Sequence, residues 1–446
     1  MVQEDPLVVH ASPTKEFFIT ILIRDIKLID AICDLIDNAV DGARRLRPSA
    51  KLNDLFIEID ASKDSFIISD NCGGIEVSVA RDYAFRFGRT KETPNSPHSI
   101  GRFGVGMKRA FFKIGSIIDI ESIAETSRFK MSIDVNKWIS PENKDKDGRE
   151  QWDFSFAECQ ESIENPVKNR QTIVSITSLH PTISAEFSAP TFKNKLIAAI
   201  ESAHSKAIEN GLRIRVGETD LSLRQISLLN SDSIKPQFTT TLYQKEKAVS
   251  VRIYAGISDQ VLSDCGWYVF CNDRLILQAD RSQLTGWDSE NGDIETPRAH
   301  YQFARFRGYV FFDSDDAGEL PWNTMKNGVD EESSIYQATR LHMINAMRPI
   351  IDFLNSLDNE LQADISPLKT IVDNAKPIQL KDVEQRQTFL GPTAAQIQQT
   401  APKEGRISYT AANEKLARAK ELLNVTSNKA VGEATFYYFL RANGDE

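Results

Sequence analysis

The sequence has 446 residues, which is too long for one compact core and predicts two or three domains. A hydrophobic content of 41% and a charged content of 26% are typical of a soluble globular protein. The net charge of −10 disfavours tracking along nucleic acid through the field of the whole chain, although a local basic patch is compatible with it.

The cysteines and the first residues indicate a cytoplasmic protein. The five cysteines form no CxxC pair and lie among apolar neighbours, which predicts reduced thiols and neither a disulfide framework nor a zinc site. The start, MVQEDPLVV, lacks the basic region and apolar core of a signal peptide. No apolar run approaches the roughly 18 residues of a membrane span. We therefore expect no membrane partner.

The first part of the chain combines helical and strand patterns. Residues 17–46 carry apolar side chains at helical spacing, and RPSA at 47–50 ends the expected helix. LFIEID at 55–60 and SFIISD at 65–70 are typical of two strands joined by a polar turn. The elements expected after them are a helix near 76–85, a loop at 86–100, strands near 116–123, 127–136 and 171–178, and helices at 190–208 and 333–362.

Composition and periodicity divide the chain into four regions. Residues 1–208 form a mixed helix-and-strand region, and residues 209–362 are β-rich with a long exit helix. Residues 363–406 are predicted to be a linker, because Gln, Pro and Thr dominate with little periodicity. Residues 407–446 are predicted to be a small helical region, either a cap packed on the chain or a docking helix for a partner.

The first helix carries polar groups on the face away from its apolar stripe. Asp34, Asn38 and Asp41 stand at i, i+4 and i+7, which is one face of a helix. An amide oxygen beside carboxylates suits a hard, octahedral Mg²⁺ that keeps waters and nucleotide phosphates as further ligands. Taken alone, Asn38 is better explained by a hydrogen bond to a neighbouring element.

The second predicted strand ends at Asp70, which is followed by the turn Cys72-Gly73-Gly74. A buried carboxylate needs hydrogen-bond donors, and the exocyclic amine of an adenine would supply one. Thr172, on the late strand QTIVSIT, is placed to hydrogen-bond near the same base. Taken alone, Asp70 is better explained as a cap of its own turn.

A glycine-rich segment, GRFGVG at 101–106, opens a helix. Its exposed backbone N–H groups and the helix N-terminus are suited to hold phosphates. One such loop occurs often by chance, but the order of acidic helix, strand–Asp–Gly turn, loop and GxxGxG does not. A Walker A loop and a Rossmann loop are both excluded, because GxxxxGK[ST] is absent and the glycines do not follow the first strand.

Four segments, DLIDNAVDG, DNCGGI, GRFGVGMKRA and QTIVSIT, resemble the ATP-binding boxes of the GHKL superfamily, which includes gyrase B, Hsp90, MutL and histidine kinases. Within the superfamily, the sequence most resembles MORC-like and related bacterial ATP-binding proteins. The resemblance covers residues 14–345. It implies an α+β fold in which a Bergerat-type ATP-binding α/β sandwich precedes a β-rich, S5-like transducer domain and a small helical tail. Asp34 stands where histidine kinases usually carry Asn, which disfavours that subgroup.

The resemblance also implies roles for the matching residues. Asn38 would bind Mg²⁺, Asp70 would bind the adenine amine with support from Thr172, and residues 86–100 would belong to an ATP lid. Lys108 would reach a phosphate, with an exposed lysine as the alternative. The other residues expected to contact the nucleotide are Asp41, Gly74, Gly101, Phe103, Gly104, Val105, Gly106 and Met107.

The second domain is expected to complete the ATP site. GWYVFCNDRLILQ and RGYVFFDSDDAGELPWNTMKNGVD resemble transducer segments, and the lysine that such domains send to the γ-phosphate would be Lys326. A lone cation in a Pro/Asn/Gly loop is also suited on physical grounds to stabilise a transferring phosphoryl group. The alternative is a solvated loop lysine. Arg274 is expected to be structural.

Asp34 departs from the hydrolysing branch, which normally carries Glu as the base four residues before the magnesium-binding Asn. Aspartate has a similar reference pKa, about 3.9 against about 4.3, but it is one methylene shorter. Asp37 could replace Asp34 as the base, but at i+3 its side chain points partly away from the face of Asp34. We therefore expect slow hydrolysis. Cys72, where the family commonly has Gly, is expected to be structural rather than redox-active.

Three functions remain open from the sequence. The first is a Mg²⁺-dependent ATPase in which ATP closes the lid and drives homodimerisation into a clamp on a nucleic-acid or protein client. Bacterial relatives of this type fit DNA transactions or defence, but fold analogy does not select the client. The second is an ATP-sensing scaffold module with negligible hydrolysis. The third is an Hsp90-like chaperone, for which the sequence shows no client-binding middle domain.

Overall fold

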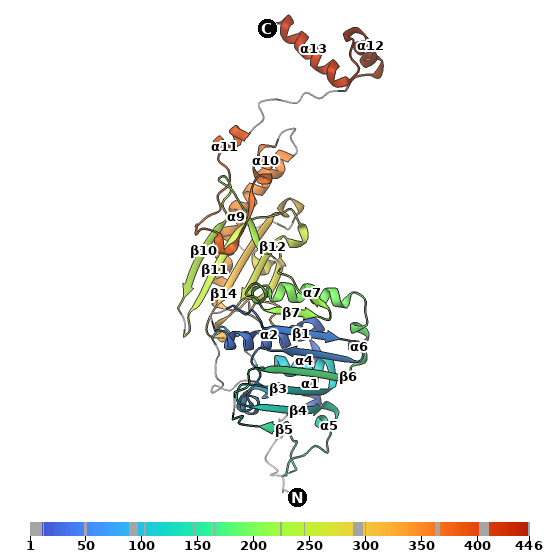
Figure 1. Ribbon diagram of the computed structural model, residues 1–446. Helices are drawn as coiled ribbons and strands as arrows, with labels where there is room; N and C mark the ends of the chain where they lie inside the picture. The colour runs from blue at the N-terminus through green and yellow to red at the C-terminus, as the bar shows by residue number, and fades with distance from the viewer. Residues whose placement is uncertain are drawn as a thin grey trace.

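The computed structural model of the chain describes residues 11, 13–48, 51–88, 97–101, 104–146, 148–164, 166–223, 225–244, 246–288, 298, 300–361, 366–400 and 410–444. These residues form two large sheets with their helices, followed by a pair of C-terminal helices (Figure 1). The protein is therefore a mixed α+β structure, as the sequence predicted.

The first sheet has, among the described residues, eight strands in the order β5-β4-β3-β6-β2-β1-β7-β8. Neighbours are antiparallel except β1 and β7, which are parallel. Alternate side chains point into the core, such as Ile57 and Ile59 of β1. The strands are β1 (Phe56–Ala61), β2 (Ser65–Asp70), β3 (Gly115–Ile123), β4 (Arg128–Asp134), β5 (Phe156–Gln160), β6 (Gln171–Leu179), β7 (Arg213–Val216) and β8 (Thr219–Asp220).

Helices α2 (Leu28–Leu46) and α4 (Gly106–Ile114) carry six of the fourteen predicted site residues. Ala31, Ile32 and Leu35 of α2 are buried in the core, and α2 contacts α4, which packs on β3 and β6. Because the apolar face of α2 packs in the core, its acidic face is left toward the cavity described below. The other helices of this part are α1 (Lys15–Arg24), α3 (Val77–Val79), a π-helical turn (Ala80–Ala84), α5 (Val135–Ile139), α6 (Pro181–Phe187), α7 (Phe192–Ala203) and α8 (Ser205–Glu209).

Two segments predicted as continuous helices are interrupted. Residues 17–46 divide into α1 and α2, because Lys27 takes an extended conformation with ψ of 151° before α2 begins. Residues 190–208 divide into α7 and α8 at His204, whose φ is −117° and whose ring hydrogen-bonds to Asp37. The second interruption therefore places a side chain at the site described below.

The second sheet has, within the described ranges, five strands in the order β10-β11-β14-β12-β13. Only β12 and β14 are parallel to each other. The long helix α9 (Ser334–Leu361) packs against β11 and β14. The strands are β10 (Gln237–Tyr243), β11 (Val249–Ile257), β12 (Gly266–Cys271), β13 (Arg274–Asp280) and β14 (Phe306–Asp313), and the short 3₁₀ turns are Leu262–Asp264, Gln283–Thr285, Tyr301–Phe303 and Ala317–Glu319.

Two expected boundaries differ in the structure. The first sheet continues beyond residue 208, because β7 pairs with β1. Residues 363–406, predicted as a linker, contain α10, β15 and α11, with Leu368 and Ile371 of α10 buried. β15 pairs with β9, so backbone hydrogen bonds supply the order that side-chain periodicity does not show. These elements are β9 (Ser227–Asn230), α10 (Pro367–Asp373), β15 (Lys376–Gln379), a 3₁₀ turn (Leu380–Asp382) and α11 (Ala394–Thr400).

Helices α12 (Asn413–Leu423) and α13 (Asn428–Ala442) contact each other, and Figure 1 shows them apart from the two sheets. Several of their apolar side chains are exposed, among them Leu422, Phe436, Tyr438 and Phe439. The packing of this pair on the rest of the chain, one of the two alternatives raised by the sequence, is not seen in this arrangement.

Candidate functional site

A cavity of about 430 Å³ lies between α2, the start of α4, and strands β2 and β6. Its lining combines residues of the first sheet and its helices with Thr324 and Lys326, which lie in the loop between β14 and α9. Phe103, predicted to contact a nucleotide, lies outside the described residues. The sequence-predicted residues that line the cavity are Asp34, Asn38, Asp41, Asp70, Gly74, Gly101, Gly104, Val105, Gly106, Met107, Lys108, Thr172 and Lys326.

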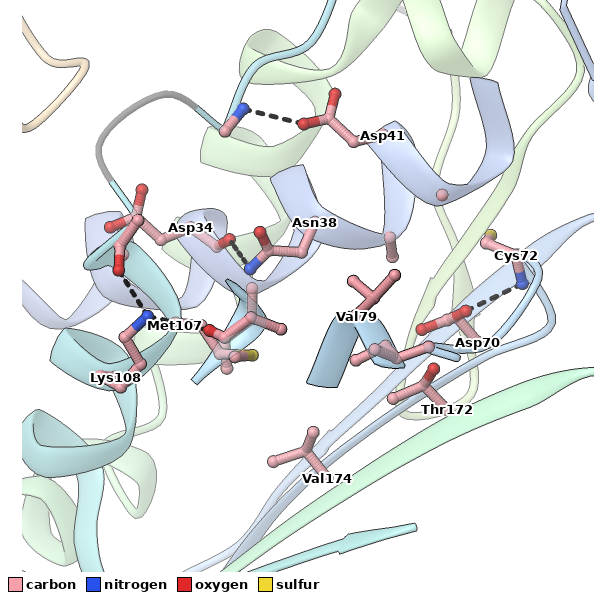
Figure 2. A pocket seen from close by; sticks show the side chains of 18 of the residues that line it. Asp34, Asn38, Asp41, Asp70, Cys72, Val79, Met107, Lys108, Thr172 and Val174 are labelled. Carbon is pink, nitrogen blue, oxygen red and sulfur yellow. Dashed lines mark hydrogen bonds between the residues drawn. The ribbon is translucent and has the colours of Figure 1, made fainter. Parts of the chain in front are cut away.

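The cavity has a polar end on α2 and a second polar end on the sheet. Figure 2 shows Asp34 and Asn38 beside Met107 and Lys108, with Asp70 and Thr172 at the other end. Val79 and Val174 lie between the two ends (Figure 2). Neither valine was predicted from the sequence, although Val174 stands two residues after Thr172 and therefore on the same face of β6.

Asn38 presents an amide oxygen at the first end. Its side chain is exposed, and its Nδ2 donates to the backbone oxygen of Asp34 at 2.9 Å (Figure 2). This hydrogen bond fixes the side-chain amide and leaves Oδ1 as its acceptor atom. A Cβ built on Gly101 would lie 3.7 Å from that Oδ1, so the glycine-rich segment passes directly beside it.

Asp41 holds the glycine-rich segment. Its carboxylate accepts hydrogen bonds from the backbone N–H groups of Ile100 and Gly101, each at 2.8 Å. Burial raises the pKa of Asp41, while these two backbone donors act in the opposite direction. The carboxylate therefore positions backbone that a ligand would contact.

The second end is formed by Asp70 and the turn that follows it. Asp70 stands opposite Thr172 in the β2–β6 pairing and accepts a hydrogen bond from the backbone N–H of Cys72 at 2.8 Å. Burial raises the pKa of Asp70 to about 6. Gly74 has a φ of 70°, and a Cβ there would come within 2.2 Å of the Ile123 oxygen, so only glycine fits this turn.

The start of α4 lies against Asp34. A Cβ on Gly106, the first residue of α4, would lie 3.0 Å from the Asp34 Cγ. Gly104 has a φ of 66°, a left-handed conformation that glycine adopts without strain. These two glycines allow the backbone and the N-terminus of a nine-residue helix to reach the acidic end of the cavity.

Lys108 joins the two sides of the glycine-rich region. Its buried ammonium donates to the backbone oxygen of Ala84 at 2.9 Å and to that of Gly104 (Figure 2). Ala84 ends the π-helical turn and Gly104 precedes α4, so one side chain connects segments about twenty positions apart. Of the two roles expected for Lys108, the exposed lysine is wrong.

Asp34 pairs with two cations. Its Oδ2 accepts from the Arg109 guanidinium at 2.6 Å, and its Oδ1 lies 3.3 Å from the Lys326 ammonium. All three side chains are buried. Arg109 follows Lys108 in the segment GMKRA but was not predicted to be a site residue, because the spacing alone does not show that it points back to α2.

Asp37 lies at the centre of a cluster that also includes residues of the second domain. Its Oδ1 accepts from His204 Nε2 and Arg274 Nε, both at 2.9 Å, and its Oδ2 accepts from Lys326 Nζ at 2.8 Å. Burial opposes ionisation, but the charges of Lys326 and Arg274 and the His204 hydrogen bond hold the pKa of Asp37 well below its usual range. Burial lowers the pKa of His204, which favours a neutral ring.

Lys326 reaches this position from a tight loop between β14 and α9. The loop is closed by the bridge between Trp322 and Val329, and Lys326 itself has a φ of 53°. The side-chain oxygen of Asn323 accepts from the backbone N–H groups of Met325 and Asn327. A loop ordered by these contacts, with the ammonium buried, excludes the solvated loop lysine that the sequence left as an alternative.

The turn between β12 and β13 of the second sheet makes another contact with α2 and with the segment that precedes α4. Asn272 Nδ2 donates to the backbone oxygen of Ser99 at 3.0 Å, and the Arg44 guanidinium lies 3.2 Å from the Asp273 carboxylate. Arg44 also donates to the His98 backbone oxygen at 3.0 Å. The described end of the glycine-rich segment is thus held by both α2 and the second domain.

The described part of the chain holds no group of three or more His, Cys, Asp or Glu side chains that could bind a metal by themselves. An amide oxygen such as that of Asn38 is a ligand type that Mg²⁺ accepts beside waters and phosphates. Within the same described ranges, no helix is long and apolar enough to cross a membrane.

Comparison with known proteins gives one family match. Residues 26–165 match the model of the histidine kinase-, DNA gyrase B- and HSP90-like ATPases. No curated protein matches the chain. The matched region includes the first three of the four segments that resemble ATP-binding boxes, and it ends before Thr172 and Lys326, which the fold brings to the same cavity.

Proposed function

We propose that the protein binds ATP and Mg²⁺ in this cavity and hydrolyses the γ-phosphate slowly, with a lysine of the second domain completing the site. The observation that carries the proposal is the convergence on one cavity of Asn38, Asp70, the glycine-rich start of α4, and Lys326. The family match to an ATPase supports the same chemistry.

The sheet end of the cavity fits an adenine ring. Asp70 offers a carboxylate to the exocyclic amine, and its second oxygen remains after Oδ1 accepts from Cys72. Thr172 adds a hydroxyl, and Val79 and Val174 supply apolar surface for the ring faces. Burial of the Cys72 thiol raises its pKa, which fits the structural role expected for it.

The helix end fits the phosphates. The N–H groups at the start of α4 are suited to bind phosphate oxygens. Asn38 Oδ1 would contribute one ligand to Mg²⁺, with phosphates and waters as the others. When bound, Mg²⁺ would neutralise phosphate charge. The donor set of one amide oxygen without a carboxylate cage fits this ion, which keeps several waters.

Hydrolysis would use Asp34 as general base. The oxygen of a water molecule attacks the γ-phosphorus, the bond from that phosphorus to the β–γ bridging oxygen breaks, and the water proton passes to the Asp34 carboxylate. The Lys326 ammonium would stabilise the charge on the transferring group. Because Arg109 and Lys326 both pair with Asp34 in this structure, the carboxylate must exchange partners before it accepts the proton, and turnover is expected to be slow.

The second sheet would act as the transducer-like domain that senses the nucleotide. Lys326 and the Asn272 turn both contact the nucleotide-binding part, so ATP would change their positions together. We propose nucleotide-dependent homodimerisation into a clamp on a nucleic-acid or protein client as the output. An ATP sensor with negligible hydrolysis is the second candidate, and the two cations on Asp34 are the observation that favours it.

Phosphate release tests the proposal. Purified protein is expected to release phosphate from ATP with Mg²⁺ and to lose this activity with EDTA, because Asn38 alone cannot organise the phosphates. Asn38→Ala should reduce activity by about 10-fold or more at fixed Mg²⁺, with the loss in metal-dependent turnover. Retained ATP binding with no Mg²⁺-dependent phosphate release would select the sensor; absence of ATP binding would reject both functions.

Nucleotide affinity is expected to rise as the pH increases through about 6, because burial raises the pKa of Asp70 to about 6 and the ionised form is the better acceptor for the adenine amine. Below that pH the affinity should fall by up to about tenfold per pH unit. The Asp70 contribution to folding stability has the opposite sign, since a carboxyl with a raised pKa destabilises the fold as pH rises. Calorimetric titration with ADP measures the affinity, and Asp70→Asn should bind weakly without this pH dependence.

A further inference from the structure

The cluster on α2 contains one more positive than negative charge. Asp34 pairs with Arg109 and Lys326, and Asp37 pairs with Arg274 and Lys326. Burial lowers the pKa of His204, the third donor to Asp37, which favours the neutral ring. Two carboxylates therefore face three permanent or protonated cations, all of them buried.

If the Lys326 ammonium leaves the cluster, two carboxylates remain paired with two cations and the charges balance. Without it, Asp34 keeps Arg109 at 2.6 Å, and Asp37 keeps Arg274 at 2.9 Å together with His204. If Arg274 were absent, the same departure would leave the fully buried Asp37 carboxylate with only a neutral hydrogen-bond donor, which is strongly unfavourable.

Arg274 is also the better anchored of the two cations. It begins β13, directly after the Asn272–Asp273 turn, and its Nη1 donates to the backbone oxygen of Leu275 at 3.0 Å. Lys326 has a flexible side chain with a single charged atom, which is shared between Asp37 at 2.8 Å and Asp34 at 3.3 Å. Arg274 is therefore the fixed partner of Asp37, and Lys326 is the exchangeable one.

We propose that Arg274 and Asp37 are positioning residues. In the absence of nucleotide they hold the Lys326 ammonium on Asp37, and they release it to the γ-phosphate when ATP binds. This inference rests on the proposed function. Asp37 binds the ammonium beside the site before the nucleotide arrives, and Arg274 compensates Asp37 once the ammonium has moved. Arg274 therefore acts on the reaction through Lys326 without touching the substrate.

The proposal makes the preference for ATP over ADP depend on Arg274. Only ATP offers a γ-phosphate to Lys326, so wild type should bind the non-hydrolysable analogue AMP-PNP more tightly than ADP, on the order of 10-fold for one charge-assisted hydrogen bond. In Arg274→Gln the ammonium stays on Asp37, and this preference should disappear while ADP affinity is retained. kcat should fall by about 10-fold or more, with little change in KM.

The double variant Asp37→Asn/Arg274→Gln separates positioning from a merely structural role. It removes the anion that retains Lys326, so both the AMP-PNP preference and kcat should recover relative to Arg274→Gln. If Arg274 only held the domains together, the double variant would be no better than the single one, and the proposal would be overturned. Arg252→Gln is the matched control, since it removes an arginine–aspartate pair within the second sheet.

Wild-type behaviour distinguishes failure of this inference from failure of the proposed function. Circular dichroism and thermal melting establish that each variant is folded. If wild type binds neither nucleotide, the proposed function is rejected. If wild type prefers AMP-PNP and Arg274→Gln keeps the full preference, the ATP site stands and the reserve role of Asp37 and Arg274 is rejected. Equal wild-type affinity for AMP-PNP and ADP rejects the transfer of Lys326 to the phosphate.

Discussion

Asp34→Asn is expected to lower Mg²⁺-dependent phosphate release by about 10²–10⁴-fold, the usual contribution of a general base. Asparagine preserves the shape of the side chain and an acceptor for Arg109, but it cannot take the proton of the attacking water. AMP-PNP affinity should stay within about threefold, because the role proposed for Asp34 is on the water rather than on the nucleotide. Phosphate release under single-turnover conditions, measured beside calorimetric binding, separates the two effects.

Asp30→Asn is the matched control for this substitution. Asp30 lies one turn earlier on α2, and its carboxylate accepts from Asn327 at 3.1 Å. Asp30 does not line the cavity, so the activity of the Asp30→Asn variant should remain near that of wild type. Full activity of Asp34→Asn would show that water is activated by another group and would reject Asp34 as the base.

Asp37 is not suited to act as the base in place of Asp34. The sequence raised it as a stand-in that points partly away from the site, and the structure shows it fully buried with three hydrogen-bond donors. The charges around it hold its pKa well below its usual range, which makes it a poor proton acceptor. A fast turnover, comparable to that of metabolic kinases, would instead contradict the expectation drawn from the short side chain and paired state of Asp34.

The parts of the site that the sequence revealed are those held by local geometry. Asn38 and Asp41 share the face of Asp34 because helical spacing puts them there, and Asp70 lies at a strand end where a turn brings its backbone close. In each case the information lies within a few residues. The same holds for the glycines that open α4.

The cluster around Asp37 depended on distant parts of the chain. Its partners His204, Arg274 and Lys326 lie 167, 237 and 289 positions away in the sequence. A signal was present, because a third aspartate on a largely apolar helix requires compensation when it is buried. Sequence spacing did not identify which cations supply it, and Arg274, expected to be structural, is one of them.

The fold shows a similar division. Alternation of apolar residues located β1, β2 and β6 almost to the residue, but it did not reveal that β7 would complete the first sheet beside β1. β15 is another element outside the reach of periodicity, since four residues acquire their order by pairing with β9. His204 stands where a regular helical pattern is interrupted, and its ring bonds to Asp37, an interaction that no local propensity encodes.

Lys326→Met is expected to lower phosphate release by about 10²–10³-fold, the range measured when one group that stabilises transition-state charge is removed. Methionine keeps the length of the side chain and loses the ammonium. The thermal midpoint should change little, because Asp34 retains Arg109 and Asp37 retains Arg274. Loss of activity without loss of stability is the combination that a surplus cation predicts.

Arg274→Met provides the contrast, because it removes the fixed partner of Asp37 and is expected to lower the thermal midpoint. Asn327→Ala is the loop control: it removes the contact to Asp30 from the same loop but leaves the ammonium in place, so activity should be largely retained. If Lys326→Met destabilises the protein as strongly as Arg274→Met and its residual turnover per folded molecule equals that of wild type, Lys326 is a structural cation. The ATP site would then be confined to α2, α4 and the first sheet, and the second domain would have no part in hydrolysis.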